Sequence, residues 1–299
     1  MKRRTHWLRN ILWLTAWAVV LVAVWQWRWL RDEYVLRTYQ PRPDVVQLLE
    51  GVELTSAGLA ALYRSDPIID DKLSFAQHCP TESAGLELGC YDGGHIFILR
   101  IDNNQLAPEM KAVLVHEMLH AVWADLPANR RQELTDRVQY YYQQEATQDI
   151  DLVERMAGYT ETEPGEESNE LHSILGSEQA ELPVSLEEHY SLYIGNRMAI
   201  VGYHEQYSAV FEKQLSELEK ELAAISSDKV TLEALNNRMT SLRNAGKIAE
   251  YNALVPQQNR LVVAINARID TYSQAVADYN ALSVVLDAQS APELVAPVK

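Results

Sequence analysis

Apolar residues recur every three or four positions along most of this 299-residue chain. Such spacing is typical of helices that bury one face. It covers five segments before residue 160, namely 44–49, 56–63, 108–124, 130–148 and 150–157. Residues 94–101 differ, because they form one short, Ile-rich apolar run that ends in a turn sequence. The pattern predicts a mainly α fold of the α+β type with a small sheet.

The last third of the chain contains two long series of apolar positions at helical spacing. They cover residues 211–242 and 251–279, and the Gly-containing sequence 244–246 lies between them. The simplest structure is an antiparallel coiled-coil hairpin over residues 203–289, with arms of ~30 residues and ~45–50 Å. Pro256 is expected to kink the second arm or to begin it afresh. Two prolines in residues 290–299 predict a disordered tail.

A long apolar segment lies near the start of the chain. Residues 11–25 contain Thr15 as their only polar member, and tryptophans lie at both ends, as in the aromatic belts of membrane helices. Residues 10–30 are therefore predicted to be a transmembrane signal anchor. A cleaved signal peptide is the alternative, but no small-residue cleavage site follows the apolar core. We expect a single-pass protein of the cell membrane, with residues 1–9 as a short cytoplasmic tail and the remainder outside.

Charge separates the two ends of the chain. Residues 1–42 hold eight Lys or Arg and two Asp or Glu, a net of +6, so the overall −16 leaves −22 on the other 257 residues. A domain with this much negative charge is expected to be repelled by nucleic acid, so nucleic acid is excluded as a partner.

The two cysteines, Cys79 and Cys90, agree with an extracytoplasmic location. Two cysteines so placed are expected to form a disulfide, which would staple a short hairpin. A small metal site with His78 and His95 is the alternative, although ten intervening residues are not a zinc-finger spacing.

The helical segment 108–124 contains the one HExxH sequence of the chain, at residues 116–120. His116 and His120 lie four apart and share a helix face, so both imidazoles can reach one Zn²⁺, while Glu117 lies about 100° further round, where it can reach a water at the metal. The alternative is a pair of core histidines bonded to backbone carbonyls. Burying Glu117 unpaired in such a helix would be costly, and the metal interpretation is preferred.

The pentapeptide and its helix resemble the active-site helix of zincin metallopeptidases. Residues 169–173, Asn-Glu-Leu-His-Ser, resemble the NExxS segment in which the gluzincin branch carries its third ligand, although Ile174 follows where that family commonly has Asp. The resemblance implies a zincin-like catalytic domain over residues 31–202, with Zn²⁺ as cofactor and Glu170 as third ligand. It also implies that the strand at 94–101 is an edge that pairs with extended substrate. From the sequence alone, an ordinary buried strand fits as well.

A catalytic zinc needs three protein ligands and an open position. Glu170 and Glu178 lie eight apart and face nearly the same side of one helix, so one can bind the metal while the other orients an imidazole N–H. Glu170 is placed first and Glu178 second. His172 points about 200° away from Glu170 and is better explained as a core or capping imidazole.

Two further features surround this helix. An acidic loop is predicted over residues 158–168, and Asn169 is expected to be the N-cap that follows it. A donor for a developing oxyanion is also required. His189, Tyr190, Tyr193 and Arg197 are candidates, and no motif singles one out.

The residues predict a membrane-anchored, extracytoplasmic zinc peptidase that cleaves a peptide or protein substrate, with Glu117 as general base. Residues 203–289 are then an arm for a protein partner. The alternative is a non-enzymatic envelope scaffold that acts through this coiled coil, with a structural or vestigial metal site.

Overall fold

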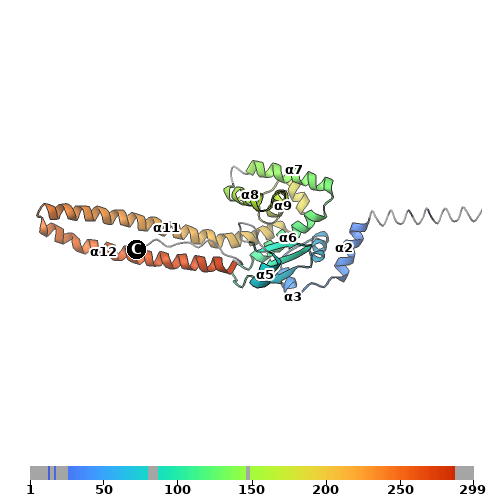
Figure 1. Ribbon diagram of the computed structural model, residues 1–299, viewed down its shortest axis with the longest axis horizontal. Coiled ribbons are helices and arrows are strands. Elements are labelled where there is room, and N and C mark those ends of the chain that lie inside the picture. The colour runs from blue at the N-terminus through green and yellow to red at the C-terminus, as the bar shows by residue number, and fades with distance from the viewer. Residues whose placement is uncertain (1–12, 14–16, 18–25, 80–86, 146–148, 287–299) are drawn as a thin grey trace, which may run out of the picture. The chain divides into compact units, whose positions relative to one another are not determined.

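The computed structural model describes residues 26–79, 87–145 and 149–286, together with Trp13 and Trp17. It is mainly helical with one small sheet, as predicted. The described residues form two compact units, which divide between Gly202 and Tyr203. The first unit contains residues up to 79, 89–99 and 110–202, and the second contains 87–88, 100–109 and 203–286 (Figure 1).

Three strands form the sheet in the order β1-β3-β2. Strand β3 (His95–Leu99) pairs in parallel with β1 (Ile68–Asp70) and antiparallel with β2 (Gly89–Asp92). The predicted apolar run is therefore a central strand, and the edge position implied by the family resemblance was wrong for it. The two edges in the described part of the sheet are β1 and β2.

The disulfide between Cys79 and Cys90 is present, as predicted. Cys79 follows α5 (Lys72–His78) and Cys90 lies in β2. The bond therefore connects the end of a helix to a strand and does not staple a hairpin. It also excludes the alternative of a metal site using these thiols, and His78 instead pairs its Nδ1 with Asp70 Oδ2 at 2.7 Å.

In the continuously described chain from residue 26, three helices come before the sheet. They are α2 (Trp27–Thr38), α3 (Pro43–Leu48) and α4 (Ser56–Arg64), so both short helices expected before residue 75 are present. Thr55 caps α4 by accepting a hydrogen bond from the Gly58 amide. Among the described residues no helix is both long and apolar enough to cross a bilayer. The predicted span 10–30 lies outside them except for Trp13, Trp17 and residues 26–30, and the two predicted tails lie outside them as well.

Five helices follow the sheet in the first unit (Figure 1). They are α6 (Glu109–Asp125), α7 (Ala128–Glu145), α8 (Ile150–Thr162), α9 (Glu167–Ser177) and α10 (Val184–Tyr190). The acidic loop predicted from residue 158 is shorter than expected, because α8 continues to Thr162. Helix α9 begins at Glu167, so Asn169 lies inside its first turn and the N-cap prediction was wrong.

The second unit contains an antiparallel pair of long helices, α11 (Arg197–Asn244) and α12 (Ile248–Leu286), as predicted. Gly246 supplies the turn with a φ of 71°. The arms pack through Ile225, Ile265 and Ile269, and Phe211 meets Tyr279 near the open end. Helix α12 continues through Pro256, so this proline does not begin the arm afresh.

Candidate metal centre

Helix α6 is apolar on most of its surface, and Val115, Met118, Leu119 and Val122 are buried. Its polar exceptions, His116, Glu117 and His120, therefore lie inside the unit. Glu117 and His120 are buried and His116 is nearly so. Ionisable groups in such a helix require partners.

Helix α9 supplies a partner because it packs closely on α6. A Cβ atom at Gly176 would lie 2.3 Å from Leu119 Cδ1 and 2.7 Å from Tyr190 Cε1, so only glycine permits this approach. Every residue of α9 from Glu170 to Ser177 is buried. The close packing brings the first turn of α9 to the polar side of α6.

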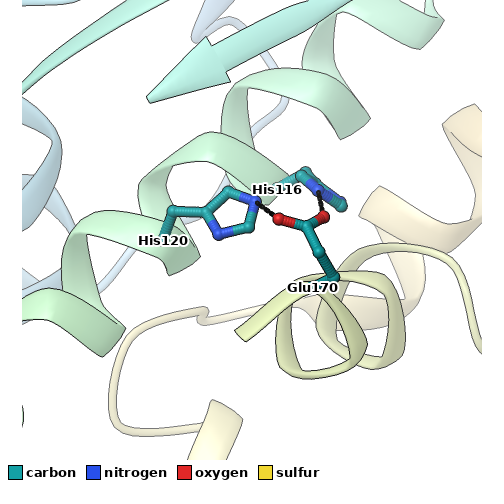
Figure 2. Close-up of side chains that lie close together, drawn as sticks. All are labelled: His116, His120 and Glu170. Carbon is teal, nitrogen blue, oxygen red and sulfur yellow. Dashed lines mark ion pairs between the residues drawn. The ribbon is translucent and has the colours of Figure 1, made fainter. Parts of the chain in front are cut away.

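The Glu170 carboxylate lies between the two imidazoles (Figure 2). Its Oε1 is 3.4 Å from His120 Nε2 and its Oε2 is 3.7 Å from His116 Nε2. One ligand atom from each of the three side chains lies within 4.8 Å of the others. In the described part of the chain this is the one cluster of three such side chains with metal-binding spacing.

The donor set fits a zinc ion. Two imidazole nitrogens and one carboxylate oxygen are the usual ligands of a catalytic site that keeps one position open. Zn–N and Zn–O bonds of about 2.0–2.1 Å place tetrahedral ligands about 3.4 Å apart, close to both Glu170 distances.

The remaining imidazole nitrogens have partners of their own. His120 Nδ1 lies 3.0 Å from Asn169 Oδ1. His116 Nδ1 lies 3.4 Å from Ser177 Oγ and 3.7 Å from a Glu178 oxygen. Such partners fix the ring orientation and leave Nε2 for the metal. The structure thus places Glu170 at the shared face and Glu178 behind His116.

Arg155 and Asn169 were missed as site residues. Arg155 on α8 holds Glu178 with two hydrogen bonds of 2.5 and 3.1 Å. Asn169 was assigned to a cap, yet it directly precedes Glu170 and so lies on an adjacent part of the same helix surface. That adjacency was the available signal for Asn169. Nothing in the sequence indicates that Arg155 reaches Glu178.

The carboxylates determine the electrostatics of the centre. Burial lowers the pKa of His116, but the nearby carboxylates of Glu170, Glu117 and Glu178 outweigh it and raise the pKa to about 9. Burial and the neighbouring His116 lower the pKa of His120. Burial would raise the pKa of Glu170, but the two imidazoles keep it below its ordinary value. The carboxylates thus favour a positive charge at this position, either a proton on His116 or a cation bound by the three side chains.

Tyr159 of α8 is a third site residue that the sequence did not single out, after Arg155 and Asn169. It lies near Arg155 and in the field of the Glu170, Glu178 and Glu117 carboxylates. Burial and these carboxylates raise the pKa of Tyr159 far above its ordinary value. It therefore stays a protonated donor at neutral pH.

The four oxyanion candidates have other contacts. The Tyr190 hydroxyl donates to the His172 carbonyl at 2.8 Å, and Arg197 donates to Glu187 at 3.0 Å and to the Ala180 carbonyl at 2.9 Å. His189 meets His172, and the Tyr193 ring packs on His189. The structure does not bring them to the Glu170 cluster.

His172 lies away from Glu170, as its position on the helix predicts. Its ring is fully buried between Trp123 and Tyr190, and its Nε2 is 2.9 Å from His189 Nε2. The core interpretation of this imidazole therefore fits its surroundings.

The buried pair makes stability depend on pH. Burial lowers the pKa of His172 well below 6.5 and that of His189 to about 4. Both rings are then neutral when folded but take up protons near pH 6.5 when unfolded, so stability is full above pH 6.5 and falls toward pH 4. The slope to measure is the change in the free energy of unfolding per pH unit. We expect His189→Gln to reduce this slope by about 1.4 kcal/mol per pH unit between pH 6 and 5. Urea unfolding at pH 7, 6 and 5 measures it, and equal slopes would contradict it.

Gly89 of β2 makes room for Glu117. A Cβ atom there would lie 2.8 Å from Glu117 Oε1 and 2.5 Å from Val113 Cγ1. The side chain of Glu117 thus contacts the backbone of the edge strand. Its position depends on this glycine.

We expect Gly89→Ala to displace Glu117, because its added Cβ would overlap the Glu117 carboxylate. In an enzyme that used Glu117 as its base, this displacement would reduce kcat/KM at least about tenfold, since small misplacements of a reacting group cost up to 10². Metal content should not change. Gly158→Ala on α8 is the matched control, because nothing lies within 4 Å of its added Cβ. A Gly89→Ala protein as active as the Gly158→Ala protein would contradict the expectation.

Comparison of the chain with protein-family models, with curated proteins and with solved structures gives no match.

Proposed function

We propose that this chain is a membrane-anchored, extracytoplasmic zinc peptidase that hydrolyses amide bonds with Glu117 as general base. One observation carries the proposal. Glu170 from α9 converges on His116 and His120 of α6, and Glu117 lies beside them in the same helix. A structural two-histidine site has no need of that second carboxylate.

Each residue has a defined role in the proposed reaction. His116, His120 and Glu170 would hold the zinc ion, which when bound supplies a Lewis acid for a carbonyl and lowers the pKa of water toward ~7. Glu117 takes the proton from the attacking water and gives it to the leaving amine. Tyr159, whose hydroxyl lies in the field of the Glu170, Glu178 and Glu117 carboxylates, would donate its O–H to the developing oxyanion.

The resemblance to zincins supports a peptide substrate. In that family an edge strand near the active-site helix pairs with extended substrate. In this chain the corresponding edge is β2, which reaches Glu117 through Gly89. A peptide added along β2 would bring its backbone past the metal centre.

The proposed location follows from three features of the chain. The apolar segment 10–30 would be the anchor, residues 1–9 would stay inside, and the Cys79–Cys90 disulfide belongs to an oxidising compartment. The hairpin of residues 203–289 would serve as an arm for a protein partner.

Metal removal and return test the proposal. The full chain, purified in detergent, is assayed with fluorescently labelled casein, and its metal content is measured by mass spectrometry. We expect about one zinc per chain, loss of hydrolysis after treatment with a chelator, and recovery when zinc is added. Hydrolysis that persists without metal would overturn the proposal. A metal-loaded chain with no hydrolysis would leave the scaffold alternative.

A further inference from the structure

The outward face of α2 is unusually apolar for a surface helix. Trp27, Trp29 and Tyr34 are 64%, 62% and 70% exposed, and Leu30 is also exposed. Arg28 and Arg37 are exposed on the same helix. Large aromatic rings beside arginines are the composition of helices that lie in a membrane interface.

The opposite face of α2 is fixed to the first unit by charge pairs. Arg31 donates two hydrogen bonds to Asp125 at the end of α6, at 2.7 and 3.3 Å. Arg64 of α4 pairs with both Asp125 and Asp32. Burial would raise the pKa of Asp125, but the two arginines hold it below its ordinary value. The network joins three helices.

The end of α2 is held as well. The ring of Tyr39, the residue after the helix, stacks on Tyr63 with 4.8 Å between centroids, and its hydroxyl donates to Asp66 at 2.8 Å. Helix α2 is thus attached to the unit from Arg31 onward, while its first turn, residues 27–30, is exposed and forms the end of the proposed anchor. It is not a free tether between the anchor and the catalytic residues.

We propose that the outward face of α2 lies in the lipid headgroup layer and holds the first unit against the membrane. The proposal depends on the anchor in the proposed function and adds a fixed attachment to it. Two observations favour lipid over a protein partner. The exposed tryptophans directly follow the apolar segment 11–25, and residues 26–42 hold four Arg against two acidic residues, a net of +2, while residues 43–299 carry −22. Only this end of the chain complements an anionic lipid surface.

The attachment determines where the metal centre lies. Asp125 and His116 are nine residues apart in α6, or about 14 Å along a helix axis. The proposed active site would then lie a short distance from the bilayer. Polypeptides held in the same membrane would reach it most readily.

Spin labels on the full chain in nanodiscs of phosphatidylcholine and phosphatidylglycerol test the proposal. A single added cysteine takes the label, because both native cysteines form the disulfide. Labels are placed at Trp29→Cys and Tyr34→Cys. Tyr140→Cys on α7 is the control, since Tyr140 is 67% exposed, nearly the same as Tyr34. We expect collisions with a water-soluble nickel reagent to fall at least about threefold at 29 and 34 relative to 140.

Equal nickel accessibility at all three positions would overturn the proposal. A fourth label, at Trp17→Cys, shows whether the anchor itself lies in the membrane, so that failure of the proposed attachment is distinguished from failure of the proposed anchor. Lipid exposure at 17 with water exposure at 29 and 34 would keep the anchor and reject the attachment. Water exposure at all four positions would reject both. Neither result depends on the proposed hydrolysis.

Discussion

Glu117→Gln should keep the metal and lose hydrolysis. Glutamine has nearly the shape of glutamate, so the packing against Gly89 is retained, but its amide cannot accept the proton of the attacking water. We expect zinc content to stay near the wild-type value while kcat falls by about 10²–10⁴-fold, the range that general acid–base catalysis contributes. Mass spectrometry and the casein assay measure the two quantities on the same preparation.

Glu188→Gln is the matched control for this variant. Glu188 lies in α10 and is exposed, so the same chemical change there should leave both metal content and rate unaltered. Wild-type hydrolysis by Glu117→Gln would reject Glu117 as the base and with it the proposed mechanism. Loss of zinc from Glu117→Gln would instead make this carboxylate a ligand.

Removing Glu170 should have the largest effect on metal binding. Its two carboxylate oxygens face His116 Nε2 and His120 Nε2, so Glu170→Ala removes one of three ligands. Glu178 faces the other nitrogen of His116 and is held by Arg155. We expect a loss in zinc affinity of more than about 100-fold for Glu170→Ala, and of about 10–100-fold for Glu178→Ala, as is usual for a residue that orients a ligand.

Competition with a chromophoric chelator measures both affinities. Glu170→Gln keeps the side-chain volume and is tested beside Glu170→Ala, so that a loss caused by a cavity is distinguished from loss of a ligand. Circular dichroism of the metal-free proteins checks that each is folded. A larger loss of zinc affinity in Glu178→Ala than in Glu170→Ala would assign the role of third ligand to Glu178.

The long helices were predictable because their signal is local. Apolar positions at steps of three and four indicate α6, α11 and α12 whatever tertiary structure surrounds these helices. Strand β1 was missed because three residues after Pro67 carry no pattern. The order of the sheet could not be predicted either, since pairing of β1 with β3 joins Ile68 to Phe97 across 29 residues. Helix α8 continues past Gly158 to Thr162, although residues 159–162 carry no apolar pattern.

The residues of the candidate site also fall into those that the sequence could predict and those that it could not. His116, Glu117 and His120 lie within one and a half turns, so their relation follows from helix geometry alone. Glu170 was identified by resemblance and by the need for a third ligand. Arg155 and Tyr159 were missed, because their positions depend on how α8 packs on α9.

Because α9 is enclosed between other helices, a metal ion bound to it would also stabilise the fold. An ion held by α6 and α9 would bridge residues about 50 positions apart and act as a cross-link, absent from the unfolded chain. The interior turns of α9, which carry the buried polar groups Glu170, His172, Ser173 and Ser177, would then open less often in the metal-bound protein. Without zinc, α9 would open more often and be cleaved more readily by cellular proteases, so that the abundance of the protein would follow the supply of zinc.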